Sequence, residues 1–414
     1  MRPGGGSTGS SLDANLPVRG HRGDFVFALV VFILLAFGLI MMYNINPALN
    51  QKLAGQGAPT DYFRNQLINT TVGIIAGLTV GSVYFMRWRR YAVALLVVAG
   101  LAIVALAVPG LHFTANGATR WLRLGPFSFQ PAELLKLALV VYLAAWFERR
   151  GHDDVRSWWD GVVPFIVMIT AASIVVVVFQ RDLGSMIVLA LAALGMFYVA
   201  GLKIKHLLIL LAIGLGAGLV AVAAFPHRLS RFVTFLHPMS DCSGNGYHIC
   251  QALIGIGSGG LFGVGLGKSI QIYGYLPEAP NDSIFAVVGE EFGLIGALII
   301  VGLFGVMIYR GFEIARKAPN EFARLVAVGI TLVFMVQACV NIGAMLSLVP
   351  LTGIPLPFVS YGGSSLVIMM CAAGLLFNIS KYTKEVAHAD SRQRRGDSRP
   401  RIAGPSNRRR VASA

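Results

Sequence analysis

The stretch DFVFALVVFILLAFGLIMMY, residues 24–43, decides what kind of fold this chain has. A helix needs roughly 20 mostly apolar residues to cross the hydrocarbon core of a bilayer, and Asp24 is the only charged residue here. Because lipid offers no hydrogen-bond partner to an exposed backbone, the stretch is predicted to be a membrane-spanning helix. A polar lead of about 23 residues precedes it and no small-residue cleavage site follows, which indicates a true span rather than a signal peptide.

The rest of the chain repeats this pattern. Of its 414 residues, 56% are hydrophobic and only 13% are charged, against about 25% charged in a soluble domain. This composition excludes a soluble multidomain protein, a secreted disulfide scaffold, a disordered chain and a globular nucleic-acid binder. The period-2 alternation of polar and apolar residues that a membrane β-barrel requires is absent from the sequence, which excludes that fold as well. We therefore predict an all-α polytopic membrane protein with ten transmembrane helices. The other nine stretches are 66–86, 91–109, 131–147, 161–179, 183–201, 206–225, 283–309, 324–348 and 364–380.

The basic residues give these spans an orientation. The chain has 34 Lys and Arg against 19 Asp and Glu, a net charge of +15. With ten spans, 25 basic residues fall on the side of the N-terminus, 8 on the other side, and Lys136 within a span. The positive-inside rule then places both termini in the cytoplasm. The predicted layout is a cytoplasmic tail (1–23), a membrane domain (24–380) and a basic tail (381–414), which we interpret as solvated near anionic lipid rather than as a nucleic-acid arm.

One outer segment is much longer than the others. Residues 226–282, between the seventh and eighth predicted helices, contain ten glycines between Gly244 and Gly274. A long loop in a compact protein is usually functional, so we favour that role over a passive cover. Cys242 and Cys250 face an oxidising space and form a candidate disulfide. The same two cysteines, together with His237 and His248, are also conceivable zinc ligands. The spacing of these four residues matches no standard zinc-binding pattern, so the sequence does not identify a metal site.

Ionisable residues within spans are costly and usually face a cavity or a partner. Glu133 and Lys136 lie three apart on one helix face, which predicts a structural ion pair. Asp182 sits at an outer turn, either as a solvated turn residue or as part of the outer mouth. Glu290 or Glu291 is expected to meet Lys136 at similar depth. These residues are predicted to form a structural polar network.

Asp282 lies where the long outer segment re-enters the membrane. Its simplest role is to cap the eighth helix, since Asp is a preferred N-cap residue. A partly dehydrated carboxylate at the mouth of an apolar bundle also suits a general base. Glu290 follows eight residues later, about 12 Å along a helix, so the two carboxylates do not suit a paired hydrolase site.

Five sequence blocks resemble the SEDS family (shape, elongation, division and sporulation), the group of FtsW, RodA and SpoVE. The resemblance covers residues 24 to 382, and each block alone is weak, but all five occur in the family's order. Where the family commonly has Gln-Pro-Asp and His-Thr-Asp, this chain has Arg181 before Asp182 and Pro280-Asn281 before Asp282. The blocks are NGATRW (116–121), QPAELLK (130–136), QRDLG (180–184), the segment from Gly246 to Gly267 leading into YLPEA (275–279), and PLPFVSYGGSS (355–365).

The resemblance implies a peptidoglycan glycosyltransferase that polymerises lipid II at the outer face of the bacterial cytoplasmic membrane. It implies that Asp282 is the essential aspartate. The implied partners are a class B penicillin-binding protein, divisome proteins and membrane lipids, and nucleic acid is not among them. Expected substrate-binding residues are Arg120, Trp121, Arg228, Arg231, Glu278 and Ser360. The arginines would stabilise pyrophosphate; no cofactor is certain, and a divalent cation is a candidate. The FtsW (division) type is favoured over a RodA-type elongation polymerase, and a lipid II flippase or a scaffold for the partner are the alternatives.

Overall fold

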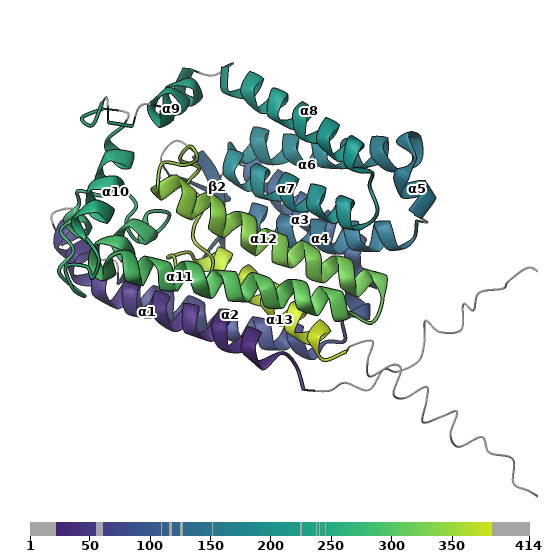
Figure 1. The fold of residues 1–414 in the computed structure, drawn as a ribbon, viewed down its shortest axis with the longest axis horizontal. Coiled ribbons are helices and arrows are strands. Elements are labelled where there is room, and N and C mark those ends of the chain that lie inside the picture. The colour runs from purple at the N-terminus through teal and green to yellow at the C-terminus, as the bar shows by residue number, and fades with distance from the viewer. Residues whose placement is uncertain are drawn as a thin grey trace, which may run out of the picture.

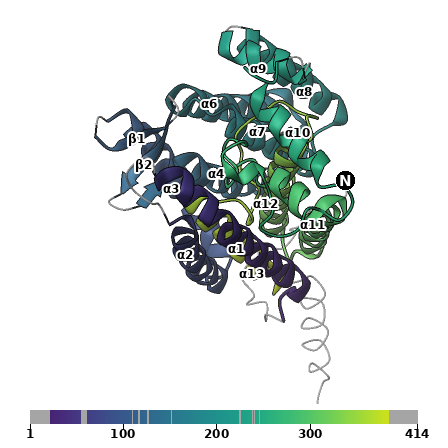
Figure 2. The ribbon, with the colours of Figure 1, turned by 90° about the vertical axis from the view of Figure 1, so that its left-hand side faces the viewer.

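The computed structural model describes residues 22–54, 61–108, 110–115, 118–124, 127–150, 152–223, 226–236, 238–239, 241–244 and 246–382. Helices running in roughly the same direction or its opposite make up most of it (Figures 1 and 2). The long helices are α1 (Phe25–Ala54), α2 (Tyr62–Ser82), α3 (Met86–Val104), α4 (Pro131–Glu148), α6 (Val163–Gln180), α7 (Leu183–Val199), α8 (Ile204–Ala223), α11 (Ile284–Lys317), α12 (Glu321–Met345) and α13 (Gly363–Ser380). The short helices are η2 (Ala105–Ala107), α5 (His152–Arg156), η3 (Trp158–Val162), α9 (Pro226–Leu236), α10 (Tyr247–Ser258) and η4 (Gln271–Tyr273).

Each of the ten predicted stretches coincides with one long helix, which confirms a polytopic helical membrane protein. Within the described residues, six helices are long and apolar enough to cross a membrane. Many apolar side chains point outward from the bundle: Phe32, Leu78 and Leu215 are 64%, 70% and 69% exposed. Water would penalise such a surface, whereas lipid tails solvate it. The number of ten crossings stays a prediction.

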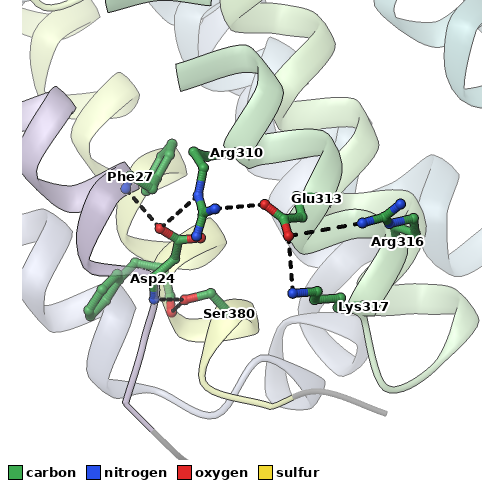
Figure 3. Close-up of polar contacts among 8 residues, drawn as sticks. Asp24, Phe27, Arg310, Glu313, Arg316, Lys317 and Ser380 are labelled. Atoms are coloured by element: carbon green, nitrogen blue, oxygen red, sulfur yellow. Dashed lines mark hydrogen bonds and ion pairs between the residues drawn. The ribbon is translucent and has the colours of Figure 1, made fainter. Parts of the chain in front are cut away.

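The first and last described segments meet at one end of the bundle (Figure 3). The backbone N–H of Asp24 donates to Ser380 Oγ at 2.9 Å, and Arg310 near the end of α11 pairs with the Asp24 carboxylate at 2.6 Å. Arg310 also pairs with Glu313, which Lys317 contacts at 3.0 Å. The two ends of the described chain therefore lie on the same side, as an even number of crossings requires. Asp282, just before α11, lies at the other end of that helix.

A small antiparallel sheet is the exception to the predicted all-α architecture within the described residues. It has the order β1 (His112–Ala115), β2 (Ala118–Leu124), β3 (Phe127–Phe129), and it stands between α3 and α4. It holds part of the NGATRW block. The backbone groups of this segment, which lies outside any helix, pair with one another between the strands.

The predicted eighth helix is broken, and the glycine-rich part of the long outer segment fits into the break. Gly293 has φ 65° and ψ −163° inside α11, and a Cβ there would lie 2.4 Å from the backbone nitrogen of Gly263. The freed N–H of Leu294 donates to the Gly260 carbonyl, and the Glu290 carbonyl accepts from Val264. A helix break at membrane depth is tolerated where protein satisfies the backbone in this way. The outer segment is thus a structured part of the bundle.

Helices α2 and α13 pack backbone to backbone through glycines, a feature that the sequence analysis does not include. Gly73, Gly77 and Gly81 are buried on α2 at four-residue intervals. They face Met370 and Gly374 of α13, and a Cβ at Gly374 would lie 2.0 Å from the Gly77 carbonyl oxygen. Small residues at such spacing let membrane helices approach closely, because lipid provides no hydrophobic drive for association.

Replacing Gly374 with alanine is therefore expected to lower the free energy of unfolding by about 1–3 kcal/mol, the usual cost of overpacking. Thermal unfolding of the purified protein in detergent measures the effect. The matched control is Gly214→Ala on α8, where nothing lies within 4 Å of the added Cβ. That control should leave Tm unchanged or slightly raised, because alanine favours helix more than glycine does. Equal Tm values for Gly374→Ala and the wild type would contradict the close packing.

Candidate functional site

Helix α12 and the 350–362 segment hold the backbone around Asp282. Asn341 of α12 donates from its side-chain nitrogen both to the Asp282 carbonyl and to the Ile354 carbonyl, each at 2.7 Å. The N–H of Tyr361 donates to the carbonyl of Pro280 at 2.8 Å. Asp282 therefore lies where the start of α11 meets α12 and the 350–362 segment between α12 and α13. These contacts use backbone groups and fix the position of the residue.

Arg120 of β2 approaches Asp282 across Gly353. A Cβ atom added to Gly353 would lie 3.7 Å from Asp282 Oδ2 and 3.9 Å from Arg120 Nη1. The distance between the carboxylate oxygen and the guanidinium nitrogen therefore cannot exceed the sum of these two values. Arg120 Nη2 also donates to the carbonyl of Arg181 at 3.1 Å, and its buried Nε has no partner. A carboxylate and a guanidinium thus lie together at the end of the bundle opposite Asp24. Gly353, at φ 70°, leaves the space between them open.

The other predicted substrate-binding residues spread around this pair. Trp121 follows Arg120 on β2 and is half-buried, and the pairing of β1 with β2 is irregular here, with Arg120 as the extra residue of a bulge. Glu278 is exposed in the turn before α11, where its carboxylate accepts a hydrogen bond from the Asn281 side chain. Arg228 and Arg231 belong to α9, but their side chains lie outside the described residues.

Ser360 supports the loop rather than facing outward. Its side chain is buried, with 4% of the residue exposed, and its hydroxyl accepts from the N–H of Leu356 at 2.8 Å. The next residue, Tyr361, stacks edge-on against Tyr62 with ring centroids 5.2 Å apart. Burial raises the pKa of the Tyr361 phenol above its usual value, opposed by a hydrogen bond with Asn65. Tyr361 is thus a neutral donor at ordinary pH, close in the chain to Ser360.

Asp182 acts as a helix cap. Its Oδ1 accepts from the N–H of Ser185 at 3.1 Å, and its Oδ2 accepts from the Ser185 hydroxyl at 2.8 Å and from Gln130 Nε2 at 3.2 Å. These contacts begin α7 and join it to the start of α4. Asp182 is 4% exposed, which does not fit a solvated turn residue, and its role at the outer mouth stays a prediction.

The predicted ion pair within α4 is present and deeply buried. Lys136 Nζ lies 2.9 Å from Glu133 Oε1, and both side chains are 2% exposed. Lys136 also donates to Gln337 Oε1 at 2.9 Å, and Gln337 Nε2 donates to the Pro355 carbonyl at 3.0 Å. The pair therefore supports the segment that leads to Ser360 and Tyr361.

The expectation that Glu290 or Glu291 meets Lys136 is wrong. Glu290 accepts from the N–H of Ile270 at 2.9 Å and from the Ser269 hydroxyl, and Glu291 accepts from Asn44 Nδ2 at 2.6 Å. The break at Gly293 separates the first turns of α11 from the rest, so both carboxylates turn toward the glycine-rich segment. They fix that segment to the bundle.

Sequence reasoning did not find Asn341 or Gln337, although a usable signal was present. Both are polar residues in an otherwise apolar span, four apart and so on one face of α12. Polar residues in spans usually have a partner, which applies to these as well as to charged ones. Their partners lie in segments far away in the chain, which no sequence pattern indicates: the Lys136 ammonium and the backbone carbonyls of Asp282, Ile354 and Pro355.

The long outer segment also contains the disulfide between Cys242 and Cys250, with Cα atoms 5.6 Å apart. It ties α10 to the turn before it, and it uses both thiols that the zinc alternative required. Two residues before Cys250, the Nε2 of His248 lies 2.6 Å from the hydroxyl oxygen of Ser283. His237 lies outside the described residues, and among those described no group of three or more His, Cys, Asp or Glu is placed to hold a metal ion.

A multi-pass membrane protein with a carboxylate and a guanidinium at one end of its bundle is the class that fold and site define. Residues 25–385 match the family of cell cycle proteins FtsW, RodA and SpoVE, and the chain belongs to that family. It is 37% identical to stage V sporulation protein E of Bacillus subtilis over 87% of this chain and 98% of that protein. It is also 37% identical to a probable peptidoglycan glycosyltransferase FtsW of Trichlorobacter lovleyi, over 88% and 94%.

Solved structures agree with this assignment. One belongs to a study of how a peptidoglycan synthase complex coordinates polymerization and crosslinking, with TM-score 0.72 and 26% identity over 86% of this chain and 97% of that one. Another is the rod shape determining protein RodA of Thermus thermophilus, with TM-score 0.61 and 26% identity over 86% and 96%. The fold is therefore shared across nearly the whole length of these relatives.

Proposed function

We propose that this protein is a peptidoglycan glycosyltransferase that polymerises lipid II at the outer face of the cytoplasmic membrane, with Asp282 as general base. The observation that carries the proposal is the Asp282 carboxylate beside the Arg120 guanidinium at the end of the bundle away from Asp24. Relatives of similar length are named probable peptidoglycan glycosyltransferases. The positive-inside rule puts Asp24 in the cytoplasm and therefore Asp282 outside.

The chemistry needs one base. Asp282 accepts the proton of an acceptor sugar hydroxyl, and the hydroxyl oxygen attacks the anomeric carbon of the donor. The bond from that carbon to undecaprenyl pyrophosphate breaks, with inversion, and pyrophosphate departs as an anion. A pyrophosphate is a good leaving group and needs no acid to protonate it, so a single base is sufficient.

Cations should stabilise the departing pyrophosphate, because charge develops there in the transition state. Arg120 is the candidate with described geometry, and its unpartnered Nε is a donor available for a phosphate oxygen. Arg228 and Arg231 on α9 stay candidates, as does a divalent cation. Trp121 and Glu278 are proposed to contact sugar or lipid near Asp282.

Arg120→Gln is expected to lower the rate of glycan synthesis by about 10²-fold, the effect of losing one electrostatic donor. The rate is measured with labelled lipid II and the purified protein. Arg64→Gln provides the control, because Arg64 is an exposed arginine near the same end of the bundle, in the first turn of α2. If Arg120→Gln synthesises glycan at the wild-type rate, Arg120 does not stabilise the departing pyrophosphate.

A flippase is the competing function, since it would handle the same lipid. A flippase needs a polar path through the whole membrane, whereas the carboxylate and guanidinium gather at one end of this bundle. Purified wild-type protein given labelled lipid II in vesicles decides between them. Glycan polymer is the expected product, and transfer of lipid II between leaflets without polymer would overturn the proposal.

The finer role that we propose is septal wall synthesis with a class B penicillin-binding protein that crosslinks the glycan, together with other divisome proteins. The support is the resemblance of the YLPEA block and of Gly289-Glu290-Glu291 to the division type. Depletion in the native bacterium should block septation and give long cells. Rounded cells of normal division frequency would indicate an elongation role instead.

A further inference from the structure

A histidine on the outer segment reaches the candidate base through one hydroxyl. His248 lies in the first turn of α10, and its Nε2 is 2.6 Å from Ser283 Oγ. Ser283 follows Asp282, and its Oγ is 3.5 Å from Asp282 Oδ1 and 2.9 Å from the Pro277 carbonyl. Ser283 is 0% exposed, whereas His248 is only partly buried. The three side chains form a row from the carboxylate toward the outer surface.

The row is built rather than incidental. Helix α10 packs directly on α11, and the Cys242–Cys250 disulfide fixes the start of α10 two residues after His248. The Ser283 hydroxyl has a single proton, which it can direct to the Pro277 carbonyl, to Asp282 or to His248. With Nε2 unprotonated, the imidazole accepts that proton; with Nε2 protonated, it donates to Ser283 Oγ. The same geometry therefore permits a proton to move in steps along the row.

We propose that His248 is a positioning residue that takes the proton from Asp282 through Ser283 in each catalytic cycle, a role that rests on the proposed general-base function. Asp282 first receives the proton of the acceptor hydroxyl. The protonated carboxyl passes it to Ser283 Oγ while the Ser283 proton moves to Nε2 of His248, which becomes imidazolium. The imidazolium releases its proton to water at the outer face, and Asp282 is again a carboxylate. Active-site hydrogen bonds are often long without substrate, so the 3.5 Å step is expected to shorten when lipid II fills the site.

The charged groups around this row are the carboxylates of Asp282 and Glu278, both in the turn before α11, and the guanidinium of Arg120 on β2. Histidine, with an ordinary pKa of about 6.5, is the member that changes charge between pH 5 and 8. An imidazolium cannot accept a proton, so activity should fall as the pH drops through about 6.5.

The test is the pH profile of kcat for glycan synthesis by the full chain from labelled lipid II. His248→Gln keeps a side chain that can hydrogen-bond to Ser283 but cannot take up a proton. Its kcat at neutral pH is expected to fall at least about tenfold, and the decline near pH 6.5 should disappear. Ser283→Ala removes the middle of the row and is expected to give the same two changes. His112→Gln is the control, since His112 lies in β1 and contacts the Val108 carbonyl.

Three outcomes overturn the proposal. The first is a His248→Gln variant that equals the wild type in rate and pH profile. The second is a His248→Gln variant whose rate is lowered equally at every pH with the decline near pH 6.5 retained, which is the behaviour of a packing residue. The third is loss of this decline in His112→Gln as well. Failure of the base assignment is recognised separately, because Asp282→Asn would then remain active whatever His248 does.

Discussion

Asp282→Asn is expected to lower glycan synthesis by about 10²–10⁴-fold, the range that a positioned general base contributes. The amide has nearly the size of the carboxylate but does not accept a proton at neutral pH. The contacts that fix this residue go to backbone atoms, from Asn341 to its carbonyl and from Tyr361 to Pro280. The variant should therefore keep its fold and its Tm while losing its chemistry. The measurement is the rate of polymer formation from labelled lipid II, with the transpeptidase partner present.

Asp61→Asn is the matched control for this change. Asp61 is an exposed aspartate that caps α2, with Oδ1 accepting from the N–H of Arg64 at 3.0 Å, and asparagine caps helices equally well. Its rate should equal that of the wild type. Polymer formation by Asp282→Asn at the wild-type rate would show that Asp282 is not the base. A fall in Tm as large as the fall in activity would instead assign it a structural role.

Lys136→Met is expected to destabilise the bundle by about 3–5 kcal/mol, because it leaves the Glu133 carboxylate buried without a counter-charge. Both members of the pair are 2% exposed, so solvent cannot replace the lost ammonium. The loss should also reach the candidate site, since Lys136 donates to Gln337, and Gln337 donates to the Pro355 carbonyl. Thermal unfolding in detergent and the polymerisation rate measure the two effects.

Two further variants identify burial as the cause. Lys317→Met removes an ammonium that lies 3.0 Å from Glu313 but is 42% exposed, and such a pair contributes less than about 1 kcal/mol. Glu133→Gln combined with Lys136→Met removes both charges and should recover most of the stability. If Lys136→Met unfolds at the same temperature as Lys317→Met, the buried pair does not stabilise the bundle in the way described.

The sequence by itself predicted the helices and the ion pair for local reasons. A run of about 20 apolar residues has one stable form in lipid, so the ten stretches coincide with ten helices. Glu133 and Lys136 lie three apart on one helix, a spacing that makes contact independent of the rest of the fold. Asp282 was found as a carboxylate at a membrane boundary, where its presence is costly without a role.

Tertiary structure decided everything that depends on which distant segments meet. Glu290 or Glu291 was expected at Lys136, but both accept hydrogen bonds from backbone N–H groups of the glycine-rich segment, which packs into the break at Gly293. Arg120 and Asn341 reach Asp282 from segments far away in the chain, and only the packed bundle brings them together. Hydropathy and helical spacing report on a residue and its neighbours within a turn or two. The polar contacts of this site are made between helices, and their geometry exists only after the helices have packed.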